Sequence, residues 1–295
     1  MNDQHTATDT QLVPLDNGAM HAAPQFVEPL RRSGLDRVGA VMETTRGRRL
    51  RALATRENWR IEIDLPHEGP RGAYLKKHHE SNRSTSWSRL ISGEEPSPGA
   101  VEALNVHRLW QDGIAAMQLV AYGERHHAGV RESFVITEEL AGYEQLDHFI
   151  RRRFALLVEQ NADEKRSLRN LIAAVASVAR RFHERGYNHR DLYCCHFFIR
   201  EQSSDCNAHD SNAFDVRLID LQRVEQRRWF RRRWVIKDLA QLAYSTPRER
   251  ISSTAQMRFI KHYLGCKRLR PADKRLIRAV LSKRDAMIRK LGPHP

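Results

Sequence analysis

The sequence predicts an α+β protein in which a small sheet-containing part precedes a larger, mainly helical part. Between residues 59 and 65, apolar and charged side chains alternate, which is the pattern of a half-buried β-strand. Between residues 168 and 182, apolar side chains recur three and four positions apart, which predicts one face of a long helix. The chain has 295 residues and is 40% hydrophobic, so it can bury a core in one large or two small domains.

The charge of the chain favours an anionic partner. Its net charge is +14 and its pI is near 10.1, which suits nucleic acid, an acidic membrane surface, or a phosphorylated or carboxylated glycan. A generally basic proteome is the plainer alternative. No run approaches the roughly 18 apolar residues of a membrane span, and residues 1–6 lack the basic start and apolar core of a signal peptide. The four cysteines show neither a disulfide framework nor zinc spacing, which favours a reducing cytosol.

The chain is expected to divide into three segments. Residues 1–34 are polar and contain prolines without periodicity, which predicts a disordered tail. Residues 35–140 predict a small lobe of five strands and one helix, and residues 141–295 predict a larger helical lobe. The strand patterns lie at residues 50–55, 59–65, 73–76, 116–122 and 133–137, with a four-residue hairpin link at 55–58 and a helix from about residue 101.

The predicted larger lobe contains a hairpin directly after its long helix. Gly186 is placed to cap the end of that helix. Residues 197–199 and 216–219 predict two antiparallel strands, and the Ser-, Asp- and Asn-rich residues 201–214 between them predict an exposed insertion. A further helix is expected to start at Pro271.

Two aspartates flank this hairpin. Asp191 lies on the loop after the long helix, and Asp220 follows the second strand. If the strands pair, Asp191 and His196 enter at the end of the hairpin from which Asp220 emerges. Phosphoryl transfer from ATP needs such a pair, one carboxylate to accept a hydroxyl proton and one to hold Mg²⁺.

A lysine and a glutamate in the small lobe form a second candidate pair. Lys76 ends the third predicted strand, and Glu102 lies early in the following helix. A buried lysine that meets phosphates needs an anionic partner, because an unpaired buried charge is costly.

Several stretches together carry a family resemblance. They are Arg60 to Ile63, Tyr74 to His78, Val120 to Glu124, Phe134 to Leu140, His189 to Phe197, Leu218 to Arg223 and Lys237 to Leu239. The chain resembles the protein-kinase-like superfamily over residues ~50–245 and, within it, the lipopolysaccharide core heptose kinases of the Kdo/WaaP and InaA-like family. The aspartate loop ending in Cys-His-Phe is the most specific stretch, since a generic kinase loop has asparagine where His196 stands.

The resemblance implies a bilobal protein-kinase-like fold, with a small β-sheet N-lobe, a mainly helical C-lobe and ATP between them. It implies that Asp191 is the catalytic base and that Asp220 binds Mg²⁺. Lys76 would contact the α- and β-phosphates of ATP, and Glu102 would hold Lys76 in place.

Four further residues receive roles from the resemblance. Glu138 and Leu140 would belong to the hinge that meets adenine, and Asp238 would brace the catalytic loop. His196 occupies the second metal position, although imidazole is a softer ligand than Mg²⁺ prefers, and its alternative role is a hydrogen bond to the loop.

Two departures from the kinase pattern stand out. Residues 55–58 contain no glycine to cover the phosphates, and Leu221-Gln222 follows Asp220 in place of Phe-Gly. The second departure argues for a kinase that is always on. Both leave open an inactive, nucleotide-binding relative.

The function expected from the resemblance is ATP-dependent phosphorylation of a heptose or Kdo hydroxyl in the lipopolysaccharide inner core. The acceptor would be an anionic glycolipid on the cytoplasmic face of the inner membrane, so the protein would be cytoplasmic and peripheral to that membrane. The alternatives are a protein or small-molecule kinase, and a non-catalytic kinase-like module that binds membrane or nucleic acid. No obligate nucleic-acid partner is expected, and the oligomeric state stays open.

Two features next to the aspartates need a separate interpretation. Residues 227–234 interleave arginines with three aromatic residues, which favours contact with an anionic ligand, the alternative being a solvated helix face. Cys194 and Cys195 adjoin the aspartate loop and are expected to be buried and structural.

Overall fold

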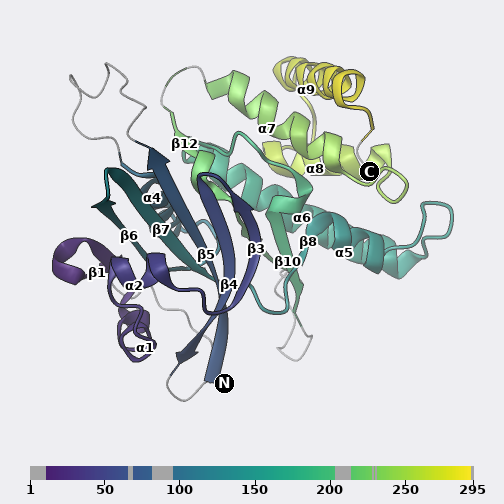
Figure 1. The fold of residues 1–295 in the computed structure, drawn as a ribbon. Coiled ribbons are helices and arrows are strands. Elements are labelled where there is room, and N and C mark those ends of the chain that lie inside the picture. The colour runs from purple at the N-terminus through teal and green to yellow at the C-terminus, as the bar shows by residue number, and fades with distance from the viewer. Residues whose placement is uncertain are drawn as a thin grey trace. The chain divides into compact units, whose positions relative to one another are not determined.

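The computed structural model describes residues 11–65, 69–81, 96–202, 214–227, 229 and 231–293. The chain divides into two compact units, whose elements are labelled in Figure 1. The first unit comprises Met1–Gln111 and Met117–Ala141, and the second comprises Asp112–Ala116 and Gly142–Pro295.

A seven-stranded sheet forms the first unit, with strand order β1-β2-β6-β7-β5-β4-β3. Its strands are β1 (Val13–Leu15), β2 (Met20–Ala22), β3 (Arg48–Leu53), β4 (Arg56–Leu65), β5 (Gly69–Ser81), β6 (Leu119–His127) and β7 (Val130–Glu138), all paired antiparallel. The predicted alternation in β4 is confirmed, because Trp59, Ile61 and Ile63 are buried in one core cluster. The link between β3 and β4 is shorter than predicted, since β4 already begins at Arg56.

The disordered tail predicted for residues 1–34 is wrong for residues 13–32, while residues 1–10 lie outside the described part. Residues 13–32 form β1, β2, two single helical turns and helix α1 (Val27–Arg32). Met20 and Leu30 are fully buried there. Pro24 opens a helical turn, a position that proline tolerates, so it does not interrupt the structure.

The described part of the first unit also contains helices α2 (Val38–Glu43) and α4 (Pro98–Gln111). Helix α4 begins three residues earlier than the sequence pattern indicated, at a proline suited to a first helical turn. The polar stretch that precedes it in the sequence, residues 82–95, lies outside the described residues.

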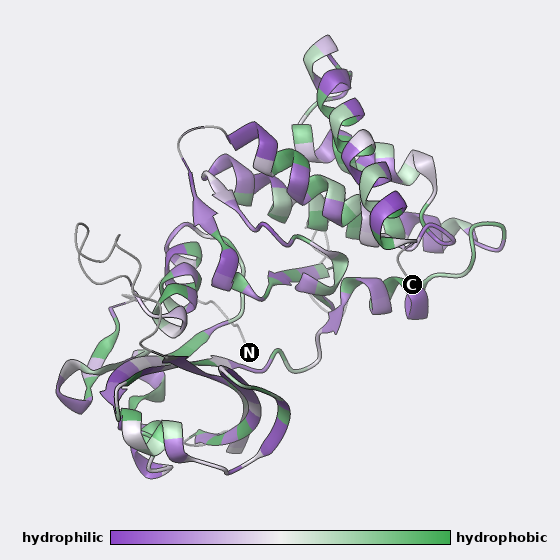
Figure 2. Ribbon diagram, turned by 45° about the horizontal axis from the view of Figure 1, so that its top comes forward, coloured by the Kyte–Doolittle hydropathy of each residue, from purple (hydrophilic) through white to green (hydrophobic). Residues whose placement is uncertain are grey.

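Helices dominate the second unit. They are α5 (Leu146–Arg153), α6 (Ala162–Glu184), α7 (Arg231–Ser245), α8 (Ser253–Leu264) and α9 (Pro271–Leu291). The predicted long helix is confirmed as α6, which starts at a capping box in which Asn161 and Glu164 satisfy each other's backbone N–H groups. Figure 2 shows hydrophilic and hydrophobic stretches alternating along these helices, as expected when one face of each is buried.

The hairpin predicted between the two aspartates is confirmed. Strands β10 (Phe197–Glu201) and β11 (Phe214–Leu218) pair antiparallel, and β8 (Glu144–Gln145) lies on the other edge of β10. Strands β9 (Tyr187–Asn188) and β12 (Glu225–Gln226) form a separate pair. Most of the insertion expected at 201–214 falls on residues 203–213, outside the described part, and its two end residues belong to the strands.

Candidate active site

In the first unit, the structure brings Lys76 and Glu102 together. Lys76 lies on β5 and Glu102 on α4, and Lys76 Nζ is 2.7 Å from Glu102 Oε1. The Glu102 side chain is fully buried, whereas that of Lys76 is 18% exposed. The positive charge of Lys76 stabilises a Glu102 carboxylate that is buried away from water. Removing Lys76 would therefore leave an uncompensated buried charge.

The predicted hinge residues lie where β7 ends. Glu138 is the last residue of β7, its backbone N–H donates to Gln118 O at 2.9 Å, and its carboxylate pairs with Arg71. Leu140 follows and is half-buried. The backbone here is therefore fixed on one side by Gln118, while the side chains of the two hinge residues remain partly open to solvent.

Sequence reasoning missed a charged cluster around the neighbouring Glu139. Arg60 donates to the Glu139 carboxylate at 2.8 Å, and the Tyr74 hydroxyl donates to it at 3.2 Å. The hydrogen bond from Arg60 is the main cause that lowers the pKa of Glu139. A Cβ at Gly72 would lie 1.7 Å from Glu139 Oε2, so a larger residue there would push the carboxylate out of this position.

In the second unit, Asp238 holds the loop that carries Asp191. Asp238 is fully buried on α7 and accepts hydrogen bonds from the backbone N–H groups of His189 at 2.8 Å and Arg190 at 2.9 Å. Arg190 adopts a left-handed φ of 70°, which is uncommon for a non-glycine residue. The brace therefore fixes a strained turn one residue before Asp191.

Two further side chains on α7 hold the same loop, and sequence reasoning missed both. Gln241 Oε1 accepts from Leu192 N at 3.2 Å, and Ser245 Oγ accepts from Cys194 N at 2.8 Å. Together with Asp238 they occupy positions three and four apart, which is one face of a helix. That spacing of polar residues within an apolar stretch was the available signal.

The Asp191 carboxylate meets three side chains. Arg223 Nη1 lies 2.6 Å from Oδ2, Gln241 Nε2 lies 3.4 Å from Oδ1, and Lys237 Nζ lies 3.9 Å from Oδ1. The carboxylate is 22% exposed. It is therefore oriented by donors and still partly open to solvent.

The structure brings His196 and Asp220 to the same end of the hairpin. His196 Nε2 lies 3.7 Å from Asp220 Oδ2, and the Ile219 N–H donates to His196 O at 3.1 Å. His196 Nδ1 donates to the backbone oxygen of Asp191, at 2.5 Å. In the neutral tautomer, that bond leaves the Nε2 lone pair available beside the Asp220 carboxylate.

The ring of His189 packs against the ring of His196. Their rings stack with centroids 5.4 Å apart, and His189 Nε2 donates to Ile219 O at 3.0 Å. Burial is the main cause that lowers the pKa of His189. Within the described ranges, no group of three or more His, Cys, Asp or Glu residues is arranged to hold a metal.

The cysteines beside the loop have no nucleophilic character. Burial raises the pKa of Cys194 to about 12 and that of Cys195 to about 11. Both thiols therefore stay protonated near neutral pH. Cys194 is buried, as predicted, and Cys195 is half-buried.

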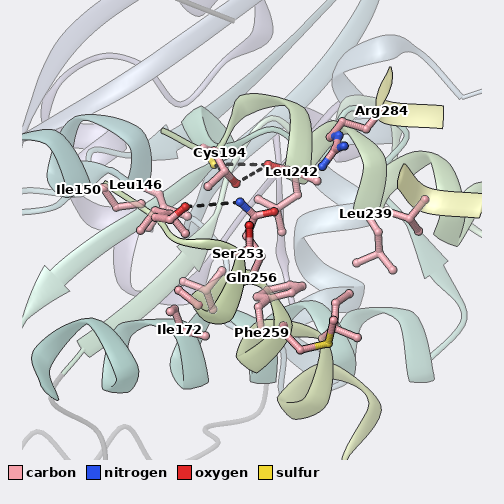
Figure 3. A pocket seen from close by; sticks show the side chains of 18 of the residues that line it. Leu146, Ile150, Ile172, Cys194, Leu239, Leu242, Ser253, Gln256, Phe259 and Arg284 are labelled. Carbon is pink, nitrogen blue, oxygen red and sulfur yellow. Dashed lines mark hydrogen bonds between the residues drawn. The ribbon is translucent and has the colours of Figure 1, made fainter. Parts of the chain in front are cut away.

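An apolar cavity of about 380 Å³ lies among α5 to α9 of the second unit (Figure 3). Leu146, Leu239 and Phe259 approach it from three different helices. Cys194 also lines it, so one wall is the aspartate loop itself. Sequence reasoning missed this cavity, because apolar helix positions that line a cavity have the same periodicity as those that fill a core.

Among the described helices, none is both long and apolar enough to cross a membrane.

Curated relatives match part of the chain. It is 34% identical over 176 residues to the lipopolysaccharide core heptose(I) kinase WaaP of Pseudomonas aeruginosa, which covers 58% of this chain and 62% of that protein. It is 32% identical over 162 residues to the protein of that name from Escherichia coli K12, covering 54% and 57%. The chain thus spans about three fifths of the length of these relatives.

A solved structure described as WaaP in complex with acyl carrier protein matches with a TM-score of 0.64 and 29% identity. The match covers 95% of this chain and 99% of that one, and it confirms the expected kinase-like fold. The model of the lipopolysaccharide kinase (Kdo/WaaP) family matches residues 41–263, a range that contains both aspartates and the Lys76 pair. The chain therefore belongs to the lipopolysaccharide kinase (Kdo/WaaP) family.

Proposed function

We propose that the protein transfers the γ-phosphate of ATP to a heptose or Kdo hydroxyl of the lipopolysaccharide inner core. The observation that carries the proposal is the aspartate loop, which three α7 side chains hold so that Asp191 is oriented and reachable. The names of the relatives at 34% and 32% identity support the sugar acceptor. Membership of a kinase family supports ATP as the phosphoryl donor.

In this proposal, Asp191 orients the acceptor hydroxyl and takes its proton. Lys76, fixed by Glu102, binds the α- and β-phosphates, and residues Glu138 to Leu140 meet adenine. Phosphoryl transfer needs little covalent chemistry from the protein, so positioning and charge neutralisation supply most of the rate.

Asp220 and His196 are the residues that would hold Mg²⁺. They offer one carboxylate and one imidazole lone pair at the same end of the hairpin. Magnesium in such sites is usually held by one or two carboxylates together with substrate phosphates and water, so the Asp220 carboxylate suits the ion, and His196 would be a softer second ligand. The ion would neutralise charge on the phosphates of ATP.

The test is transfer of labelled γ-phosphate from Mg-ATP to dephosphorylated inner-core lipopolysaccharide. Asp191→Asn keeps the shape of the side chain and removes the base, so label should fall at least a hundredfold. Asp163→Asn, which changes an 87% exposed carboxylate on α6, is the matched control and should transfer normally.

Three outcomes distinguish the alternatives. Transfer to a peptide or a soluble aminoglycoside, with none to lipopolysaccharide, would mean a protein or small-molecule kinase. ATP binding without transfer to any acceptor would favour the non-catalytic module. Loss of ATP affinity in Lys76→Met, with retained binding in Asp191→Asn, would support the assigned division of roles.

Location at the cytoplasmic face of the inner membrane is part of the same proposal. Because the net charge is +14, the protein should sediment with vesicles that contain anionic lipid and not with neutral vesicles. Equal sedimentation with both would contradict a peripheral electrostatic attachment.

A second proposal concerns an acyl carrier protein. The similar solved structure contains one, and the cavity described above is apolar and within the size range of ligand pockets. We expect an acylated carrier protein to bind with its acyl chain in this cavity. Ala243→Phe, which fills the cavity, should abolish the preference for acylated over unacylated carrier, whereas Ala272→Phe at an exposed α9 position should preserve it.

A further inference from the structure

Four cations surround one indole ring next to the aspartate loop. The side chains of Arg190, Arg227, Arg233 and Lys237 lie 5.0, 5.2, 4.6 and 5.8 Å from the ring centroid of Trp234. All four lie within the roughly 6 Å at which cations are attracted to an aromatic face. We refer to these four cations and Trp234 as the Trp234 cluster.

The Trp234 cluster carries more positive charge than its surroundings neutralise. In the described part of the chain, ion pairs join Arg190 and Arg227 to a single carboxylate, that of Glu225. Lys237 shares Asp191 with Arg223, whose Nη1 is 2.6 Å from that carboxylate. Four cations thus share two partly exposed carboxylates, and Arg233 adds a fifth positive charge beside Trp234.

The buried Asp238 does not remove this excess. Its carboxylate accepts from two backbone N–H groups, and counting it still leaves more cations than anions. Burial is the main cause that lowers the pKa of Lys237, Asp191 opposes it, and the charges of Arg223 and Arg190 lower it further.

A purely structural role does not account for the Trp234 cluster. Partly exposed ion pairs contribute little to stability, while crowding like charges destabilises the folded state. The Nε–H of Arg190 is also buried without a hydrogen-bond partner among the described residues. Such groups are stabilised when an anion approaches them, because charge-assisted hydrogen bonds to a carboxylate or phosphate are the strong ones.

The Trp234 cluster lies beside Asp191, and this position indicates which anion it would bind. Arg190 directly precedes Asp191, and Lys237 Nζ is 3.9 Å from Asp191 Oδ1. An anion held here therefore lies beside the hydroxyl that Asp191 receives. Arg227 is 42% exposed and Arg223 is 49% exposed, so both can turn toward such a group.

We propose that Arg223, Arg227 and Lys237 bind a carboxylate or phosphate group carried by the acceptor glycan next to the hydroxyl that is phosphorylated. The proposal rests on the proposed function, to which it adds the residues that select an anionic acceptor over a neutral one. Trp234 holds Arg227 and Lys237 together, and the acceptor anion replaces the interaction that Arg223 makes with Asp191. The Oδ2 atom of Asp191 is then released to meet the hydroxyl.

The test measures binding of delipidated inner-core oligosaccharide by calorimetry without ATP. A second probe is the same oligosaccharide with its carboxylates reduced to alcohols and its phosphates removed. Arg227→Gln should raise the Kd for the anionic probe about tenfold, the size expected for one lost charge-assisted hydrogen bond. The Kd for the neutral probe should be unchanged.

The matched control is Arg232→Gln, which removes an equal charge from an exposed α7 position and should leave both Kd values unchanged. Equal losses in Arg227→Gln and Arg232→Gln would overturn the site, since they would reflect net charge alone. A loss by Arg227→Gln that is equal for both probes would overturn the anion assignment.

Two further measurements are needed. One distinguishes a glycan anion from a lipid headgroup, and the other distinguishes failure of the anion site from failure of the proposed function. If Arg227→Gln weakens binding to phosphatidylglycerol vesicles and not to the oligosaccharide, the anion is a lipid headgroup and the glycan site is wrong. In phosphoryl-transfer assays, Arg223→Gln should raise KM for the acceptor and leave KM for ATP unchanged. If no variant or wild-type protein transfers phosphate while anion-dependent binding persists, the proposed function fails and the anion site stands.

Discussion

Replacing Asp238 by asparagine tests whether the buried brace fixes the aspartate loop. The carboxylate uses one oxygen for each of two backbone N–H groups, at 2.8 Å to His189 and 2.9 Å to Arg190. Asparagine offers one oxygen, so in either orientation of the amide one N–H faces an NH₂ group. Hydrogen bonds to charged acceptors contribute about 1.5–3 kcal/mol, so the loss should be about 2 kcal/mol.

Amide hydrogen exchange of the full chain measures this loss locally. About 2 kcal/mol corresponds to roughly a thirtyfold faster exchange of one of the two amides. Asp163→Asn on the exposed face of α6 serves as the control and should leave the loop unchanged. Unaltered exchange at both His189 and Arg190 in Asp238→Asn would refute the argument that the carboxylate holds this turn.

Three further substitutions test the first unit. Gly72→Ala should lower stability by at most about 1 kcal/mol in thermal unfolding, because the new Cβ would push the flexible Glu139 carboxylate away from Arg60 and weaken a partly exposed ion pair, and a loss of several kcal/mol would contradict a carboxylate that can move. Burial is the main cause that lowers the pKa of His78 to about 4 from 6.5. Since the unfolded chain takes up the proton first, about 3 kcal/mol of stability should disappear as the pH falls from 6.5 to 4, and His78→Gln should flatten that limb of a urea-unfolding profile. Burial likewise lowers the pKa of Lys77 below 10.5, so wild type should gain stability relative to Lys77→Met as the pH rises toward 10.5, and parallel profiles would count against a buried charge.

Local periodicity explains which elements could be predicted. The alternation in β4 and the three- and four-residue spacing in α6 are properties of short windows, and the structure confirms both. Residues 13–32 have no such period, and Met20 and Leu30 become buried through contacts with distant parts of the chain. The tail prediction failed because tertiary packing, not a local pattern, orders this segment.

The residues of the candidate site also fall into two groups, those that a local sequence pattern placed correctly and those that no local pattern indicated. The sequence order of Asp191, His196 and Asp220 around a predicted hairpin was enough to place them at one end of it, and the pairing Phe197 with Leu218 does so. The supports on α7 were harder to foresee. Gln241 and Ser245 act on backbone N–H groups of a loop some 50 residues away in sequence, and a side chain that binds backbone leaves no complementary residue type to look for.

Backbone strain links these supports to the chemistry. Among the described residues, five non-glycine positions have a positive φ, and three of them lie in turns at residues 16–17 and 128. The other two are Arg190 at 70° and Asp220 at 57°, directly before the proposed base and at the proposed metal ligand. Such conformations cost about 1–3 kcal/mol each and persist where the surrounding structure over-determines them.

Two contacts fix the backbone conformation of Arg190. Asp238 accepts a hydrogen bond from its N–H, and Lys237 donates one to its backbone oxygen. The backbone before Asp220 is held at Ile219, whose N–H donates to the backbone oxygen of His196 and whose C=O accepts from the His189 ring. Both strained residues are therefore fixed by contacts that the chain itself supplies. This arrangement favours a site that is assembled before substrate arrives, in keeping with the absence of a Phe-Gly pair after Asp220.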